Sequence, residues 1–398
     1  MPPMSDPVDA PAPGSTSSLR AANQRRVVEV LQRSEDRRPV SQADIARATR
    51  LAPATVSNIV RELSGAGMVE TTVVGGRRGT MVRIAREAGY VAGIDFGHRH
   101  LRVAVGDLSG EIHAVEREPI APDHPHEDGL ALAGEMLDRL AAQVGTERSA
   151  IAHVGLGLPT PLDRDGLVMS AAILPGWVGV DAHREAERVL GRPTTIENDA
   201  NLGALAEHRW GAGRGHATMA YVKVSSGVGA GLVIDGQIFR GAFGTAGELG
   251  HLTIDEQGPF CRCGSRGCLE AYASVGMAQE ALADQMPGAG VDDLVAAARQ
   301  GAMGPLRVFE DAGLRLGWGL AMLANLLNPS CVVVGGDMSR AGDLLLDPVR
   351  VGLRRHALAS VSAATEVRLA SLGDRASVIG AVMLALDSTE LIPATGVG

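Results

Sequence analysis

Apolar side chains recur at helical spacing in the first part of the chain, before the pattern changes to that of strands. The first helix is expected from about Leu19. Its apolar face comprises Leu19, Asn23, Val27, Val30 and Leu31. A second, short helix should follow Ser41, because the Ser41 hydroxyl can cap the free backbone amide of Asp44.

A third helix is expected from Pro53, which stands where a first helical residue belongs. Its apolar stripe comprises Val56, Ile59, Val60 and Leu63. The residues away from the centre of that stripe are Thr55, Ser57, Asn58 and Arg61. Two short helices around a tight turn, the second with small polar residues and an arginine outward, predict a helix-turn-helix whose second helix enters the major groove of DNA. These four polar residues are therefore the candidate base-contacting residues.

Residues 68–84, MVETTVVGGRRGTMVRI, contain two β-rich runs around GGRRG and predict a hairpin. Arg77 and Arg78 lie at its tip, where their guanidinium groups can bind phosphates or enter a narrow minor groove. A helical pair used only for dimerisation is the alternative, but it would not need a basic hairpin tip. The pattern thus predicts a winged helix-turn-helix DNA-binding domain over residues 19–88.

The leader and the charge distribution add further expectations. Residues 1–18 are rich in Pro, Ser and Ala without periodicity, which predicts a disordered leader. No stretch is continuously apolar for the roughly 18 residues of a membrane span, so a cytoplasmic protein with no membrane partner is expected. Residues 1–89 hold 13 Arg and 9 acidic residues, whereas the rest holds 24 basic and 37 acidic ones. This asymmetry favours nucleic-acid binding by the N-terminal part alone, although chance fluctuation in a short segment also produces it.

Beyond residue 89 the pattern is that of an α/β protein. The segments YVAGIDFGHRHLRVAVGDLSGEI from Tyr90 and MAYVKVSSGVGAGLVIDGQIF from Met219 resemble copies of one unit, in which two apolar strands flank a turn of small or Gly residues. Repetition at a separation of roughly 130 residues predicts two similar halves that face each other across a cleft. A long helix over residues 305–327 precedes a buried strand that begins at Cys331, which is most simply a small core residue.

The other three cysteines fall within residues 261–270, CRCGSRGCLE. A disulfide framework would need an export signal, and the N-terminus has no apolar core of that kind. Thiolates crowded into a Gly-rich loop are typical metal ligands, because the glycines let several sulfur atoms converge on one ion. A redox loop of free thiols is the alternative, but it leaves the Gly spacing unexplained.

Several segments together resemble one known family. The two hairpins, joined by a helix and the Gly-Gly turn near residue 335, resemble the actin-like ATPase fold, in which two Gly-rich turns close over nucleotide phosphates. Three further segments make the resemblance specific: GLGLPTPLD from Gly155, ENDANLGALAEHRWG from Glu197, and GELGHL from Gly247 followed by the cysteine loop. From residue 19 to about 385 the chain resembles the ROK family of sugar kinases and transcriptional regulators. The winged helix-turn-helix implies one of the family's regulators, with a two-lobed sugar-kinase-like body over residues 89–398.

The resemblance also implies two sets of ligand-binding residues. In this family the cysteine loop binds a structural zinc with a preceding His, which here gives a zinc loop over residues 251–268 with the ligands His251, Cys261, Cys263 and Cys268. Three thiolates and one imidazole make a closed tetrahedral site, which is structural rather than catalytic. The residues assigned to the hydroxyl groups of one sugar or sugar phosphate are Asn198, Asp199, Glu248, His251 and Glu270. Helix capping is the alternative for Asn198 and Asp199.

Both phosphate turns depart from those of the family's kinases. The kinases carry Asp-x-Gly-Gly-Thr, whereas residues 95–99 read Asp-Phe-Gly-His-Arg, with bulky side chains in place of a Gly and a hydroxyl. Residues 225–227 read Ser-Ser-Gly in place of Gly-Thr-Gly, which disfavours close approach of the backbone to a phosphate. These changes argue against binding of ATP and Mg²⁺, and they leave the residues of any nucleotide site unknown. In a kinase, Asp199 would be the general base.

We therefore expect a sugar-responsive transcriptional regulator of carbohydrate metabolism, more specifically a repressor. It should bind an inverted-repeat operator as a homodimer or homotetramer, because a symmetric oligomer presents its DNA-binding domains in symmetric pairs. The rival hypothesis is an active ATP-dependent sugar kinase, similar to a glucokinase, with an attached DNA-binding domain. Asp199 serves both hypotheses, whereas His98 and Arg99 in the first turn favour the sensor.

Overall fold

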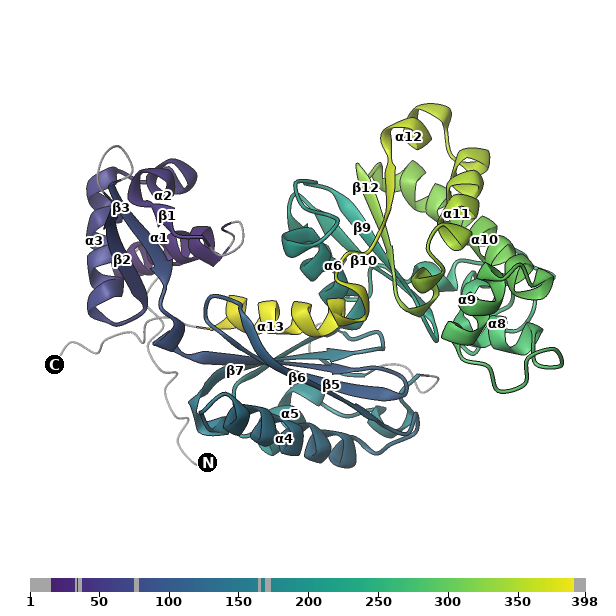
Figure 1. The fold of residues 1–398 in the computed structure, drawn as a ribbon, viewed down its shortest axis with the longest axis horizontal. Coiled ribbons are helices and arrows are strands. Elements are labelled where there is room, and N and C mark those ends of the chain that lie inside the picture. The colour runs from purple at the N-terminus through teal and green to yellow at the C-terminus, as the bar shows by residue number, and fades with distance from the viewer. Residues whose placement is uncertain are drawn as a thin grey trace, which may run out of the picture. The chain divides into compact units, whose positions relative to one another are not determined.

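The computed structural model describes residues 16–32, 34, 38–74, 79–163, 166–168 and 173–389. These residues form two compact units. The first unit comprises the residues up to Tyr90, the segment Gly106–Glu111 and Thr389, and the second comprises Val91–Val105 and Ile112–Ser388. The chain is shown in Figure 1.

The first unit is a helix-turn-helix followed by a β-hairpin, as predicted (Figure 1). Its elements in chain order are α1 (Thr16–Gln32), β1 (Val40–Ser41), α2 (Gln42–Thr49), α3 (Pro53–Gly65), β2 (Val69–Val74) and β3 (Gly79–Ile84). The strands form a sheet in the order β1-β3-β2, and β2 pairs with β3 in antiparallel register. The hairpin tip at 75–78, which holds Arg77 and Arg78, lies outside the described residues.

Local signals in the sequence explain where these helices begin. The Ser41 hydroxyl accepts a hydrogen bond from the Asp44 amide at 3.1 Å, which confirms the predicted cap. Pro53 is the first residue of α3, and the predicted apolar stripe of this helix is buried. Both features agree with expectation because caps and amphipathic spacing are local properties of the chain.

Helix α1 differs from expectation in two respects. It begins at Thr16, so residues 16–18, assigned to the disordered leader, are helical. Leu19 was placed on the apolar face but is 62% exposed, and the buried side chains are those of Val27, Val28 and Leu31. The physical reason is that the N-terminal half of α1 meets α3 through polar groups, with Gln24 Nε2 donating to Glu62 Oε2 at 2.9 Å.

The second unit contains two five-stranded sheets. The first sheet and its helices are β4 (Tyr90–Phe96), β5 (His100–Asp107), β6 (Ile112–Pro119), α4 (His126–Gln143), β7 (Ile151–Leu158), α5 (Ala182–Leu190), β8 (Thr194–Asn198) and α6 (Asp199–Trp210). The second set is β9 (Met219–Val224), β10 (Val228–Ile234), β11 (Gln237–Ile238), α7 (Glu270–Ala273), α8 (Val275–Ala281), α9 (Val291–Arg299), α10 (Met303–Leu327), β12 (Cys331–Gly335), α11 (Asp343–His356), α12 (Ala359–Ala364), β13 (Glu366–Leu369) and α13 (Ala376–Ser388). Short 3₁₀ helices are η2 (Arg86–Ala88), η3 (Arg148–Ala150), η4 (Pro175–Trp177), η5 (Leu249–His251), η6 (Asp337–Ala341) and η7 (Gly373–Arg375).

The two sheets have the same topology. Their strand orders are β6-β5-β4-β7-β8 and β11-β10-β9-β12-β13, so in each sheet the first strand of the hairpin is central. In the second sheet β9 pairs antiparallel with β10 and parallel with β12. The internal repeat predicted from the sequence is therefore confirmed.

Helices α6 and α13 connect the two sheets. Helix α13 packs on β7 of the first sheet, α6 packs on β9 and β10 of the second, and the two helices pack against each other. Figure 1 shows α13 on the face of the first sheet opposite α4 and α5. Gly380 of α13 makes this contact possible, because a Cβ atom there would overlap the Leu202 carbonyl of α6.

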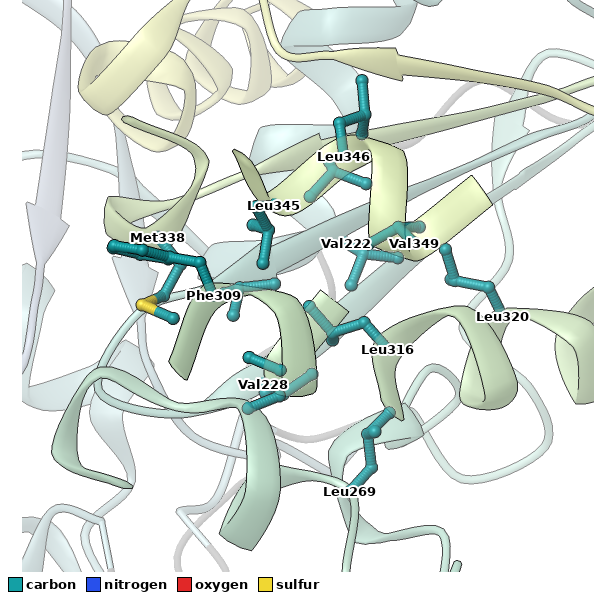
Figure 2. Close-up of a cluster of buried hydrophobic side chains, with 14 of the residues drawn as sticks. Val222, Val228, Leu269, Phe309, Leu316, Leu320, Met338, Leu345, Leu346 and Val349 are labelled. Carbon is teal, nitrogen blue, oxygen red and sulfur yellow. The ribbon is translucent and has the colours of Figure 1, made fainter. Parts of the chain in front are cut away.

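The core of the second sheet is apolar and continuous with helices α10 and α11 (Figure 2). Val222 and Val228 of the sheet meet Phe309 and Leu316 of α10 and Val349 of α11. Cys331 is fully buried, as expected for a small core residue. Among the described helices, none is long and apolar enough to cross a membrane.

Replacement of Gly380 with Ala is expected to lower the free energy of unfolding by about 1–3 kcal/mol, because the new methyl group overlaps the backbone of α6. Gly276→Ala in α8 is the matched control, since the nearest atom to its new methyl group lies 3.9 Å away. The control should gain about 0.5–1 kcal/mol from helix propensity. Denaturant titration followed by circular dichroism measures both variants, and equal stability would contradict the close packing of α6 and α13.

Candidate functional site

Three cysteines and one histidine converge in the loop that follows β11. The ligand atoms of His251, Cys261, Cys263 and Cys268 all lie within 4.8 Å of one another. The sulfur atoms of Cys263 and Cys268 are 3.7 Å apart, and Cys261 Sγ is 3.8 Å from His251 Nδ1. Ligands about 2.3 Å from a central metal ion would be about 3.8 Å apart at tetrahedral angles. The donor set and its spacing therefore fit one tetrahedral metal ion.

Backbone hydrogen bonds shape this loop. The amide of Cys261 donates to the Ser265 carbonyl at 2.9 Å, and the amide of Gly264 donates to the Cys261 carbonyl at 3.0 Å, so the chain forms a closed turn that contains Cys263. Burial raises the pKa of the Cys268 thiol to about 12. Such a thiol needs a nearby cation to lose its proton, which is the chemistry that a bound metal ion supplies.

His251 belongs to both predicted sets of ligand-binding residues, and its two ring nitrogens allow this. Nδ1 faces Cys261, whereas Nε2 lies 3.8 Å from Glu248 Oε2. The candidate metal ligands and the predicted sugar-binding residues therefore meet at one imidazole ring.

Asn198 and Asp199 lie at the start of α6. The Asn198 side-chain oxygen accepts hydrogen bonds from the amides of Ala200 and Asn201 at 2.9 and 3.3 Å, so Asn198 is the helix cap that the alternative interpretation proposed. Asp199 does not cap the helix in this way. It is buried, and its Oδ2 atom lies 2.7 Å from Lys223 Nζ.

Glu248 and Glu270 complete the predicted set. Burial, together with the negative charges of Asp199 and Glu270, raises the pKa of Glu248 to about 7, which places the three carboxylates in one electrostatic cluster. Glu270 is buried and already paired, since Oε2 accepts from the Val228 amide at 3.0 Å and Oε1 from Arg262 Nε at 2.8 Å. The structure thus brings the predicted residues together around the start of α6 and the start of β10.

The second phosphate turn is covered by side chains of the cysteine loop. A Cβ atom on Gly227 would lie 2.6 Å from Glu270 Oε2, and Arg262 donates to the Ser226 carbonyl at 3.3 Å. The Val228 amide, a donor that a phosphate would need, is bound to the Glu270 carboxylate. A phosphate would therefore have to displace a carboxylate of the same charge.

A pocket lined by Asp95 and His100 lies beside the first turn, and three of its basic side chains have partners within the protein. Lys223 pairs with Asp199, and Arg102 Nη2 lies 2.7 Å from Asp374 Oδ2. Arg340 pairs with both Asp292 and Asp337. These internal pairs leave the three cations less available to a nucleotide phosphate.

Some buried polar atoms of the described residues have no hydrogen-bond partner, and one of them belongs to Asp95, which lines the same pocket. Among the described residues they are Asp95 Oδ1, His98 Nδ1, Thr160 Oγ1, Arg192 Nε and Asn201 Oδ1. The Thr160 carbonyl accepts from Asn198 Nδ2 at 3.2 Å, which places Thr160 beside the cap of α6. Burial and the charges of Arg262 and Arg99 lower the pKa of His98, so this ring is neutral near pH 7. Unpaired polar atoms of this kind are expected where a ligand or water completes the site.

Sequence analysis missed Lys223 and Arg262, which the structure places in direct contact with Asp199 and Glu270. Lys223 carries a signal that could have revealed it. It is the only lysine in the chain, and it interrupts the otherwise apolar strand MAYVKV. Arg262 has no comparable signal, because one arginine in a polar loop is ordinary.

The candidate DNA-contacting residues lie on α3 with unequal exposure. Asn58 and Arg61 are exposed, with Arg61 donating to Asn58 Oδ1 at 3.0 Å, whereas Thr55 and Ser57 are half-buried. Arg77 and Arg78 lie outside the described residues. Asn58 and Arg61 are therefore best placed to reach a ligand from this helix.

Fold and site together define a class of protein, a winged helix joined to a kinase-like body that has two repeated sheets and a His-Cys₃ cluster. The chain belongs to the ROK family, whose model matches residues 91–388, and residues 20–79 match the MarR family. The xylose repressor of Bacillus subtilis (strain 168) is 29% identical over 374 residues, which cover 93% of this chain and 96% of that protein.

Two solved structures are also similar. A ROK family transcriptional regulator, described as a homolog of the E. coli MLC protein, has a TM-score of 0.78 and 23% identity, covering 94% of this chain and 98% of that chain. A ROK family glucokinase from Streptomyces griseus, in complex with glucose and AMPPNP, has a TM-score of 0.61 and 30% identity, covering 75% of this chain and 100% of that chain. The first similarity shows the shared fold.

Purified protein prepared without chelator is expected to contain about one metal ion per chain, because four ligands converge on one tetrahedral position. Cys263→Ser should lose the metal, and Cys268→Ser should also lose stability. Cys331→Ser is the control, since Cys331 lies in the core of the second sheet away from the cluster. Elemental analysis by plasma mass spectrometry measures the content, and a folded metal-free wild type would rule out the site.

Proposed function

We propose that this protein is a sugar-responsive transcriptional repressor that binds operator DNA through its winged helix and a sugar through its kinase-like body. The support for both parts is that the xylose repressor of Bacillus subtilis aligns over 93% of the chain, winged helix included. The glucokinase from Streptomyces griseus covers only 75% of it. The DNA-binding domain is proposed over residues 19–88 and the effector body over residues 89–398.

The observation that carries the preference for a sensor is the covered second turn. Glu270 and Arg262 bind the backbone groups around Gly227, and His98 and Arg99 stand in the first turn. These contacts disfavour binding of ATP and Mg²⁺, while the carboxylates, amide and imidazole that suit sugar hydroxyls remain grouped. An active sugar kinase with Asp199 as general base is the second candidate function, supported by the similarity to glucokinases.

Zinc is the metal that we propose for the cysteine loop. Three thiolates and one imidazole in tetrahedral arrangement favour Zn²⁺, and a site with no open position stabilises structure. The loop also carries Arg262 and ends next to Glu270, so zinc would hold the residues that cover the second turn.

The mode of DNA binding follows from α3. Asn58 and Arg61 would contact base edges, supported by Thr55 and Ser57, while Arg77 and Arg78 would contact phosphates or the minor groove. A homodimer or homotetramer would present pairs of these helices to an inverted-repeat operator.

The sugar-binding part predicts affinity without turnover. In calorimetric titrations with D-xylose and D-glucose, the wild type should bind at least one of these sugars, and Asp199→Ala should bind neither measurably. A coupled assay for ADP release with MgATP should show no turnover in either form. Turnover in the wild type that disappears in Asp199→Ala would establish the kinase instead.

The DNA-binding part predicts that Arg61→Ala relaxes sequence preference, at a cost of about 1–3 kcal/mol for a lost bidentate base contact. Arg77→Ala should instead weaken binding to every sequence and reduce the salt slope by about one unit if this residue binds phosphate. Arg307→Ala, an exposed arginine on α10, is the control and should leave both properties unchanged. Binding selection on random DNA provides the measurement, and the absence of any enriched sequence would exclude a repressor of this kind.

A further inference from the structure

Lys223 is the only lysine of this chain, which contains 36 arginines. It lies on the central strand β9 of the second sheet, between apolar neighbours, with its side chain only 18% exposed. Arginine presents a planar fork of donors, whereas lysine presents a compact point charge. The one position at which the chain uses the compact cation is therefore inside the cleft.

Two helices, α6 and α13, contact the Lys223 ammonium group. Nζ lies 2.7 Å from Asp199 Oδ2 of α6 and 3.3 Å from Ser377 Oγ of α13. The Ser377 hydroxyl donates in turn to the Asp199 backbone carbonyl at 3.0 Å. Lys223 is thus joined to the helix pair that connects the two sheets.

A second buried carboxylate, that of Asp95, lines the same pocket as this cation. Asp95 of β4 is 1% exposed, and its Oδ1 atom has no partner among the described residues. Burial would raise the pKa of Asp95, but the positive charge of Lys223 and the neighbouring His100 ring lower it below its ordinary value. Burial raises the pKa of Asp199, and Lys223 opposes that rise.

Few ionisable side chains surround Lys223 and the carboxylates of Asp95 and Asp199. The ionisable side chains that face Lys223 are Asp199, Asp95 and Tyr221. Those that face Asp95 or Asp199 from the other side are His100, Arg102 and Glu248. Without Lys223, two carboxylates would be buried with no adjacent ammonium group, which is strongly unfavourable.

We propose that Lys223 is the resident cation of the cleft and the positioning residue for Asp199. Its ammonium group keeps the Asp199 carboxylate ionised and oriented to accept a hydrogen bond from a sugar hydroxyl, and it neutralises charge without a metal–nucleotide complex. The same ion pair weakens Asp199 as a proton acceptor, because a neighbouring cation stabilises the carboxylate form. This inference rests on the proposed sugar-binding function.

The first test needs no sugar, because a single lysine gives a single signal. Full-length protein labelled with ¹⁵N-lysine should show one side-chain ammonium resonance, which is protected from exchange with water and shifts in Asp199→Asn. An ammonium resonance whose protons exchange freely with water, and whose chemical shift is unchanged in Asp199→Asn, would contradict the ion pair.

The second test separates charge from packing. Lys223→Met keeps the length of the side chain and removes the charge, so the folded-state pKa of Asp199, which burial already raises, should rise further above its unfolded value. Stability is then retained at low pH and lost as pH rises, and the deficit in Tm relative to wild type should be larger at pH 8 than at pH 5. In Asp199→Asn/Lys223→Met this pH dependence should diminish. A deficit that is equal at both pH values would show that Lys223 acts only through packing, and would overturn the proposal.

The third test concerns the ligand, with D-xylose and D-glucose as probes at pH 8. Lys223→Met should weaken binding about tenfold, the equivalent of one charge-assisted hydrogen bond, and Lys223→Arg should recover part of the loss. Addition of MgATP should leave the wild-type affinity unchanged. Wild-type affinity in Lys223→Met would overturn the proposal. If the wild type bound neither sugar, both the proposed sugar-binding function and the positioning role of Lys223 would be wrong. The first two tests would still decide whether Lys223 neutralises the carboxylates.

Discussion

The close packing of α6 against α13 is the constraint on which the second unit depends. The two helices carry contacts from one sheet to the other, and a buried carboxylate fixes them at the far end from the cleft. Glu207 of α6 is fully buried, and it accepts hydrogen bonds from the amides of Ala212 and Leu372, each at 2.8 Å. The loop that leads into α13 is thereby tied to the end of α6. The start of α6, which bears Asn198 and Asp199, is consequently presented by rigid elements rather than by a loop.

Charge compensation in the cleft comes from the protein itself. A kinase of this architecture needs donors and cations for nucleotide phosphates, whereas here the Val228 amide is bound by Glu270 and Lys223 is bound by Asp199. The loop with the His-Cys₃ cluster supplies Arg262 and leads directly into α7, which begins at Glu270, so the cluster, the second turn and the carboxylates form one connected network.

Local features of the fold could be predicted from sequence, and long-range ones could not. The Ser41 cap, the start of α3 at Pro53 and the repeated hairpins follow from residues close together in the chain, and each is confirmed. The exposure of Leu19 and the pairing of Lys223 depend on residues distant in sequence. Periodicity alone therefore placed Leu19 on the buried face and gave no indication of the ion pair between Lys223 and Asp199. The three cysteines of the candidate metal cluster were predicted from their local spacing, whereas His251 was predicted from the resemblance to the family. The domain boundaries, the identity of the metal and the DNA-contacting residues stay predictions.

The position of the single lysine also determines where a lysine-specific protease can cut the chain. An enzyme that cuts only after lysine has one target bond, between Lys223 and Val224, and that bond lies within β9, which pairs with β10 on one side and β12 on the other. Strand backbone held on both sides does not enter a protease active site until the surrounding structure opens. Digestion by such an enzyme would therefore report the opening of the second sheet alone, and the winged helix could unfold completely without a single cut.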